Sequence, residues 1–272
     1  MERQKGKMPP IALITDLGDR DYFVSSMKGV ILSINPEAKI VDITHQVPKQ
    51  DVRTASFILA NAAETFPKGS TFVAVVDPGV GTERLCILVR TENELNFIGP
   101  DNGVFTLAAE KFGIEEVRKI SNKDLLRSDI SSTFHGRDVM APVAAHLSSG
   151  LKPKKVGERI EKLELIDMKK PKSMTKGIRG EILHIDDFGN VITNVGADLI
   201  EKRADTGTTL KIKVDDHELK APFVKTFGEV PEGGNLCYIG SSNLLEIAKN
   251  RGNLSDEINV ERGNELFINV VG

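Results

Sequence analysis

The chain of 272 residues is 40% hydrophobic and 28% charged, and it contains no low-complexity tract or internal repeat. This composition is typical of a globular protein and argues against a disordered or repeat architecture. A formal net charge of -3 argues against a nucleic-acid partner, because binding to a phosphate backbone depends on a positive surface.

The sequence also argues against a membrane partner and against disulfides. It has no uninterrupted apolar stretch of about 18 residues, the length needed to cross a bilayer. Its two cysteines, Cys86 and Cys237, lie far apart and belong to no metal-binding pair, which is typical of thiols in a reducing compartment. We therefore expect a cytoplasmic location.

The first part of the chain alternates short β-branched runs with helical patterns, which predicts an α/β domain with a mostly parallel sheet. Apolar residues recur at helical spacing between Phe23 and Ile34, and a second apolar-faced helix is expected from Val52 to Ala63, capped by Asp51. A third helix is expected over residues 138–147. The predicted strands are residues 11–15, 40–43, 71–76, 86–89 and 96–98.

The composition changes near residue 152. Residues 152–178 are rich in lysine and proline, which is typical of a solvated connection. Closely spaced strands with glycine- and aspartate-containing turns follow it, and they predict a small β-barrel or sandwich. We assign the two domains to residues 1–165 and 166–272. The strands expected in the second are residues 181–185, 191–194, 209–214, 236–239 and 266–271.

Four strands of the first domain lead into polar or glycine-rich turns. In open α/β sheets, ligands bind beyond the carboxyl ends of the strands, so four such turns together indicate a site. The rim has no phosphate-binding glycine motif and is acidic, which suits a ribose diol, a divalent metal or a cationic ligand such as a sulfonium nucleoside. The turns are Thr15–Gly18, Asp42–His45, Asp77–Gly81 and Gly99–Gly103.

Six separated motifs resemble those of the S-adenosylmethionine hydroxide adenosyltransferase family, which is related to the fluorinase and chlorinase. They occur in order from about Ile11 to Val271, and this agreement is far more specific than any single motif. The motifs are ITDLG, VVDPGVGTER, IGPDNG, TFHGRDVMAP, HIDDFGNVITN and YIGSSNLLEIAKN.

The resemblance implies an N-terminal α/β domain, a C-terminal β-barrel and a homotrimer whose ligand lies between the first domain of one subunit and the barrel of the next. It also implies a water-activating trio that matches Asp77, Arg84 and His135. The reaction expected is hydrolysis of S-adenosyl-L-methionine (SAM) to adenosine and L-methionine by a water that attacks the ribose 5′ carbon.

The same resemblance assigns the substrate contacts. Asp16 matches the residue that accepts the two ribose hydroxyls, and Asp186 the one that binds the amino group of methionine. Ser241 is the expected anchor of the methionine carboxylate, because the arginine that follows this serine in the halogenases is absent. The adenine contacts are matched by Asn190 for the polar edge and by Phe188 and Phe227 for the apolar walls.

The chemistry is compatible with these residues alone. A sulfonium departs as a neutral thioether, so expulsion of methionine requires neither a general acid nor a metal, and we expect no cofactor. Arg84 stays protonated and cannot be a base. His135 and Asp77 are both candidates for the proton acceptor, and the sequence does not decide between them.

Three other functions compete with hydrolysis. A SAM halogenase would use the same fold, but the anionic Asp77 beside the nucleophile would repel a halide. A metal-dependent hydrolase would use Asp16, Asp77, Asp101 and His135 as ligands, although the chain lacks a close ligand pair such as HExxH. A non-catalytic sensor of SAM or adenosine is the third. His45 lies on the rim and matches no role in the family.

Overall fold

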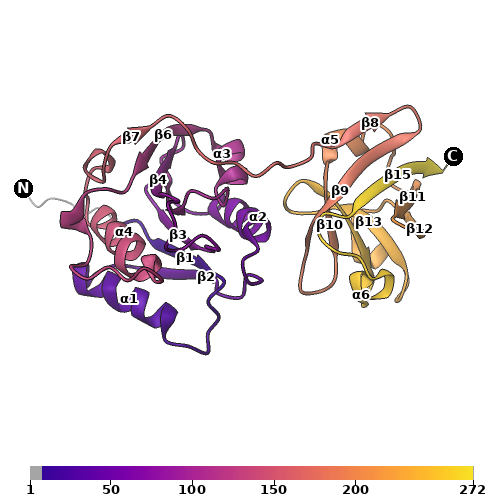
Figure 1. Cartoon of the computed structure of the whole chain (residues 1–272). Coiled ribbons are helices and arrows are strands. Elements are labelled where there is room, and N and C mark those ends of the chain that lie inside the picture. Colours follow the sequence, from indigo (N-terminus) through magenta and orange to yellow (C-terminus); the bar gives the residue numbers. More distant parts are fainter. Residues whose placement is uncertain (1–7, 272) are drawn as a thin grey trace, which may run out of the picture. The chain divides into compact units, whose positions relative to one another are not determined.

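The computed structural model describes residues 8–271, which form two compact units that meet in the sequence at Ile166 and Asp167 (Figure 1). Each unit has its own hydrophobic core. Within residues 8–271, none of the helices combines the length and the apolar character needed to span a bilayer.

The first unit is built on a seven-stranded sheet in the order β2-β1-β3-β5-β4-β6-β7. The first four strands of this order pair in parallel, and the pairs involving β4, β6 and β7 are antiparallel. The strands are β1 (Ile11–Thr15), β2 (Ile40–Thr44), β3 (Thr71–Val75), β4 (Cys86–Thr91), β5 (Asn96–Pro100), β6 (Ile114–Lys119) and β7 (Arg159–Ile160).

Helices cover both faces of this sheet because its central strands are apolar on both sides. In β1, Ile11 and Leu13 face the core that contains α1 (Phe23–Ile34) and α4 (Ala141–Ser148). The alternate residues Ala12 and Ile14 face the core that contains α2 (Val52–Ala63) and α3 (Thr106–Phe112). The sheet is therefore the middle layer of three, an arrangement that follows from this period-two alternation.

Helix α2 begins at the predicted cap. The Asp51 side chain accepts a hydrogen bond from the Thr54 backbone N–H at 2.9 Å and another from the Thr54 hydroxyl at 2.6 Å. Because this cap satisfies an otherwise unpaired helix N–H, we expect Asp51→Ala to lower the free energy of unfolding by about 1 kcal/mol. Urea denaturation of the variant and the parent measures the difference, and equal midpoints would contradict the role of the cap.

Two expectations for residues 136–178 need correction. The third helix starts earlier, as a π-helical turn over Gly136–Met140 that continues into α4, so residues 138–140 are not regular α-helix. The lysine-rich stretch is not one solvated connection, because its first part belongs to the first unit. In this first part, Val156 is fully buried and β7 pairs with β6. Apolar residues that recur among the lysines allow this part of the stretch to pack against the first unit.

The second unit is an antiparallel sheet in the order β12-β11-β15-β9-β10-β14-β13. A bridge between Phe223, just after β12, and Cys237 in β13 connects the two ends of this order. The sheet is thereby nearly closed, and the predicted fold class, an α/β domain followed by a small β-barrel, is confirmed. The strands are β8 (Lys172–Met174, paired with β9), β9 (Gly177–Ile185), β10 (Val191–Gly196), β11 (Thr209–Val214), β12 (His217–Pro222), β13 (Asn235–Ile239), β14 (Leu244–Lys249) and β15 (Glu265–Val271), with short helices α5 (Ala197–Ile200) and α6 (Leu254–Ile258).

Candidate active site

The centre of the first sheet is a topological switch point. Strand β1 lies between β2 and β3 and pairs with both in parallel. The connections from β1 to β2 and from β2 to β3 therefore lead to opposite sides of β1, which opens a crevice at the carboxyl ends of β1 and β3. Asp16 follows β1, and Asp77 comes two residues after β3 ends.

Arg84 joins the other two members of the predicted trio. Its Nε donates to Asp77 Oδ1 at 3.0 Å, and one Nη donates to both Asp77 Oδ2 and, at 2.9 Å, His135 Nδ1. The side chains of Arg84 and Asp77 are only 10% and 6% exposed. The structure therefore brings Asp77, Arg84 and His135 together as one hydrogen-bonded group, with the arginine in the middle.

Cys86 is a further member of this group that the sequence did not indicate. The remaining Nη of Arg84 lies 3.0 Å from its Sγ. Burial raises the pKa of the Cys86 thiol despite the neighbouring guanidinium, so the sulfur is a neutral thiol that accepts this hydrogen bond. The clue in the sequence was that Cys86 stands two residues after Arg84 at the start of β4.

The hydrogen bond to Arg84 fixes the tautomer of His135. A guanidinium can only donate, so Nδ1 of the neutral imidazole is the acceptor and the ring proton lies on Nε2. Burial and the positive charge of Arg84 lower the pKa of His135, although Asp77 and Asp138 oppose them. The ring is therefore neutral at neutral pH, with an N–H group at Nε2.

Two close backbone approaches hold the loops of this group together. Gly81 has φ +80°, and a Cβ there would lie 2.6 Å from the Ser132 carbonyl oxygen. Gly136 packs against β3, where a Cβ would lie 3.0 Å from a methyl carbon of Val75. A side chain at Gly81 would clash with the Ser132 backbone, and one at Gly136 would force Val75 to shift, which accounts for the glycines in both motifs.

The π-helical turn after His135 is anchored by a buried carboxylate. Asp138 has no exposed surface and accepts hydrogen bonds from Arg137 at 2.7 Å and from the Ser131 N–H at 2.9 Å, with Arg127 3.1 Å away. Burial raises the pKa of Asp138, but these donors outweigh it and lower the pKa below its ordinary value. The turn is thus tied to the loop that precedes His135.

Asp16 is held at the end of β1 by the loop that follows β2. Its Oδ2 accepts the Gln50 backbone N–H at 2.8 Å, and its carbonyl oxygen accepts from Lys49 Nζ. The side chain is partly exposed, and its second oxygen makes no hydrogen bond within the described part of the first unit. That oxygen is available to a polar ligand.

The residues predicted for the adenine and the amino group line one pocket of the second unit. This pocket has a volume of about 600 Å³, and Asp186, Phe188, Asn190 and Phe227 form part of its wall. Phe188 is 78% exposed within this unit, an unusual exposure for a large apolar ring. An aromatic side chain in this position is suited to stack on a planar ligand.

The turn that carries these residues is organised by Asp186. Its Oδ1 accepts the backbone N–H groups of Phe188 and Asn190, both at 2.9 Å, and its Oδ2 accepts the Asn190 side-chain amide at 2.8 Å. The amide oxygen of Asn190 therefore points elsewhere and can accept a hydrogen bond. The carboxylate of Asp186 keeps spare lone pairs beside those it uses in the turn.

The structure does not bring Ser241 into this pocket. It is exposed in the turn between β13 and β14 and is not among the residues that line the wall. Two residues that the sequence analysis missed, Lys249 and Arg251, do line it. The available signal was that Lys249 lies within the YIGSSNLLEIAKN motif, and the structure places it at the end of β14.

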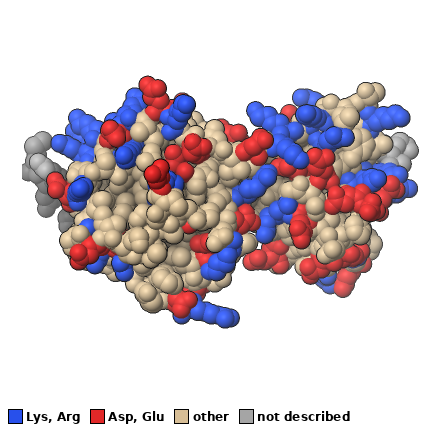
Figure 2. Space-filling view, viewed as in Figure 1, with Lys and Arg blue, Asp and Glu red and all other residues tan. Residues whose placement is uncertain are grey.

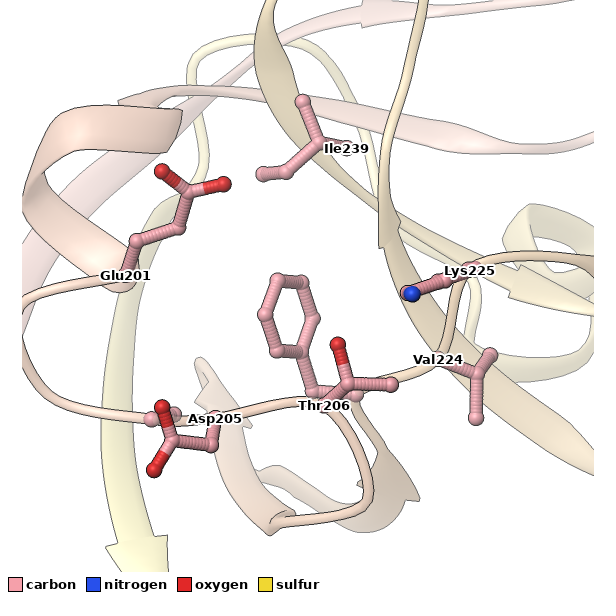
Figure 3. Close-up of a pocket in the computed structure, with 8 residues that line it drawn as sticks. Glu201, Asp205, Thr206, Val224, Lys225 and Ile239 are labelled. Atoms are coloured by element: carbon pink, nitrogen blue, oxygen red, sulfur yellow. The ribbon is translucent and has the colours of Figure 1, made fainter.

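A second pocket of about 440 Å³ lies elsewhere in the barrel (Figure 3). Phe223 and Ile239 supply apolar surface, and the charged side chains around it are Glu201, Asp205 and Lys225. All three of these charged residues are exposed. Their charges are therefore solvated by water, unlike the charged groups of a buried polar binding site. None of the predicted site residues lines this pocket.

Two of the four ligands suggested for a metal-dependent hydrolase, Asp77 and Asp101, make other contacts. Both oxygens of Asp77 face Arg84, and Asp101 Oδ1 accepts the Glu164 N–H at 2.9 Å. Within residues 8–271, no three His, Cys, Asp or Glu side chains are grouped to hold a metal ion.

On the visible face of the first unit, acidic and basic side chains are interspersed (Figure 2).

The chain is similar to proteins of known activity over almost its whole length. A protein of Thermus thermophilus named (R)-S-adenosyl-L-methionine hydrolase is 37% identical over 263 residues, which cover 94% of this chain and 98% of that protein. A fluorinase of Actinopolyspora mzabensis is 27% identical over 284 residues, covering 94% and 95% of the two chains. The hydrolase is thus the nearer of these two relatives.

A solved structure and the family's domains agree with these relatives. The crystal structure of an uncharacterized conserved protein from Thermotoga maritima matches with a TM-score of 0.92 and 43% identity, covering 95% of this chain and 99% of that one. Residues 11–157 match the SAM hydroxide adenosyltransferase N-terminal domain, and residues 180–267 match the C-terminal domain. With both domains matched in order, this chain belongs to the SAM hydroxide adenosyltransferase family.

Proposed function

We propose that this protein hydrolyses SAM to adenosine and L-methionine through in-line attack of water on the ribose 5′ carbon. The observation that carries the proposal is the hydrogen-bonded group of Asp77, Arg84 and His135 at the switch point of the sheet, in which the Asp77 and Arg84 side chains are largely buried. The family and the similarity to hydrolases at 37% identity support the same reaction. A carboxylate in this group disfavours a halide nucleophile, which supports hydrolysis over the halogenase alternative.

Asp77 is the proton acceptor in this proposal. The Nδ1 lone pair of His135 is occupied by Arg84, and Nε2 carries a proton, so the neutral ring offers the water a donor. Asp77 is acceptor-only and retains lone pairs beyond those used by Arg84. The attacking water therefore accepts from His135 and gives its proton to Asp77, while Arg84 holds both groups and stabilises the developing negative charge.

The residues need only to position and deprotonate this water. Alignment of the water with the ribose carbon can supply about 7 to 11 kcal/mol of the barrier reduction, and base catalysis adds about 10²- to 10⁴-fold. Methionine leaves as a neutral thioether, so this chain's own residues supply every step and no metal or cofactor enters the mechanism. The products are adenosine with a new 5′ hydroxyl and free methionine.

The substrate contacts are divided between the two units. Asp16 accepts hydrogen bonds from the ribose hydroxyls. Asp186 binds the ammonium group of the methionine part, and Ser241 binds the carboxylate of the methionine part. Asn190 contacts the adenine edge, and Phe188 and Phe227 cover its faces. Phe188 is strongly exposed in the single chain, which supports a site whose apolar wall is covered only when subunits assemble. We place this assembly in a cytoplasmic homotrimer whose subunits share each site.

Identification of the nucleoside product tests the proposed reaction. The protein is incubated with each sulfonium epimer of SAM in chloride buffer, and the products are separated by chromatography with mass detection. We expect adenosine from the (R) epimer, because the similar hydrolase carries that epimer in its name. A 5′-chloro nucleoside would favour the halogenase, and SAM recovered intact would favour the sensor.

The acid limb of the pH profile follows from His135. Because burial and Arg84 lower its pKa below the ordinary value of about 6.5, the ring keeps its neutral form to lower pH than a free histidine. Protonation would place a donor against the Arg84 guanidinium and break their hydrogen bond. We expect kcat/KM to stay level down to about pH 6.5 and to fall below it. An acid limb centred above pH 7 would contradict this assignment.

S-Adenosylhomocysteine should be inert because it lacks the sulfonium. Its homocysteine would have to depart as a thiolate, a much poorer leaving group than a neutral thioether. We expect no adenosine after incubation with enzyme that consumes SAM completely under the same conditions. Accumulation of adenosine from S-adenosylhomocysteine, followed by chromatography, would show that the leaving group is assisted.

A further inference from the structure

A chain of four polar side chains leads from helix α1 to the end of β1. Lys28 Nζ lies 2.6 Å from Asp42 Oδ2, and Asp42 Oδ1 lies 3.1 Å from His45 Nε2. His45 Nδ1 in turn lies 3.0 Å from the hydroxyl of Thr15. These side chains come from α1, β1 and β2 with the loop after it, three segments of the first unit that can be followed in Figure 1, and their contacts join the three segments.

The two inner members of this series of four side chains are buried. Thr15 has no exposed surface, and His45 is 6% exposed. The outer half, Lys28 and Asp42, is partly exposed. Burial raises the pKa of Asp42, but the contacts from Lys28 and His45 outweigh it and lower the pKa, so the carboxylate is ionised beside the ring.

Thr15 contacts both His45 and the turn after β1 through its hydroxyl. Its hydroxyl oxygen also accepts the Leu17 backbone N–H at 3.2 Å, and its own proton is available to His45 Nδ1. A proton on Nε2 suits the contact with the Asp42 carboxylate, which would repel a lone pair at that position. His45 Nε2 makes no hydrogen bond of good geometry, so its contact with Asp42 Oδ1 is electrostatic.

These contacts converge on the turn that carries Asp16. The Thr15 hydroxyl holds the Leu17 N–H, and the His45 carbonyl oxygen accepts the Gly18 N–H at 2.8 Å. His45 therefore binds both sides of Asp16, through its ring before it and through its backbone after it. The third restraint is the Gln50 N–H on the Asp16 carboxylate, from the same loop that His45 begins.

We infer that His45 is a positioning residue that aims the Asp16 carboxylate at the ribose hydroxyls. The inference rests on the proposed function, because it presumes that Asp16 binds the ribose. His45 and Thr15 do not touch the substrate. They fix the orientation of the turn after β1 that carries Asp16. A small rotation of this turn would misalign the two hydrogen bonds between the Asp16 carboxylate and the ribose hydroxyls, because hydrogen bonds weaken steeply when they are bent.

Ligands that differ only in the ribose hydroxyls separate positioning from general stability. Calorimetry gives the Kd of adenosine and of 2′,3′-dideoxyadenosine for the parent protein, Thr15→Val and Thr15→Ser. Valine has the shape of threonine without the hydroxyl, and serine retains the hydroxyl. We expect Thr15→Val to weaken adenosine binding about tenfold with little change for the dideoxy analogue, and Thr15→Ser to restore the parent's preference. His45→Ala should behave like Thr15→Val.

An unchanged preference for adenosine in a folded Thr15→Val protein, or equal weakening of both nucleosides, overturns the inference. Should that variant not fold, Asp42→Asn, whose side chain is 42% exposed, provides the same comparison with a smaller expected loss of preference. SAM cleavage by the parent protein is measured first. Failure there defeats the proposed function together with this inference, whereas normal cleavage with an unchanged nucleoside preference defeats only the positioning role.

Discussion

Replacement of Asp77 by alanine should lower kcat for SAM hydrolysis by about 10²- to 10⁴-fold while the Kd for SAM changes little. The variant removes the group that accepts the proton of the attacking water, an interaction used in the transition state rather than in substrate binding. It also releases Arg84, which loses both of its contacts to the carboxylate. Single-turnover kinetics measures the chemical step, and calorimetry measures SAM binding.

Two further variants make the Asp77 result specific. Asp77→Asn keeps the size of the side chain but cannot take the proton, so it should lose as much activity as Asp77→Ala. Glu83→Ala removes an exposed carboxylate from the same loop and should keep the parent's kcat. A normal kcat with weak SAM binding in Asp77→Ala would mean that Asp77 binds the substrate and does not act in the chemical step.

Replacement of His135 by alanine should be the second most damaging change. We expect kcat to fall by about 10²-fold, because the water loses the donor that orients it and Arg84 loses its contact at 2.9 Å. His135→Gln, whose amide can still donate, should recover part of the activity. His146→Gln on α4 is the matched control and should keep the parent's kcat.

The pH profile distinguishes the role of His135 from a structural one. If protonation of this ring causes the acid limb, the limb disappears in His135→Gln although some activity persists. A limb of unchanged position in the variant would assign it to another group. Activity lower in His135→Gln than in Asp77→Asn would contradict the assignment of Asp77 as the proton acceptor.

Much of the fold could be predicted because period-two and helical patterns are strong signals in buried elements. The patterns at β1, α1 and α2 gave the observed bounds, and Asp51 caps α2 as expected. Weaker patterns hid α3 and β6, where Thr106 and Ile114 begin short, partly exposed elements. The π-helical turn was also missed, because the contacts of buried Asp138 that anchor it leave no signal in the hydrophobic periodicity.

The candidate site was predictable as a set of residues but not as a geometry. The motifs placed Asp77, Arg84 and His135 at loop positions, and the structure joins their side chains. Sequence alone could not decide which of His135 and Asp77 takes the proton, because that depends on which ring nitrogen faces Arg84. Cys86 was missed for a related reason, since its contact depends on how far the guanidinium extends along β4.

In the proposed mechanism an activated water, held by Asp77 and His135, attacks the ribose 5′ carbon. Mass spectrometry of adenosine formed from SAM in ¹⁸O-labelled water shows whether this attack occurs. We predict one labelled oxygen in each adenosine molecule, at the 5′ position, and none in methionine. Adenosine without the label, or a nucleoside that carries no 5′ oxygen from solvent, would contradict the mechanism and the roles assigned to both residues.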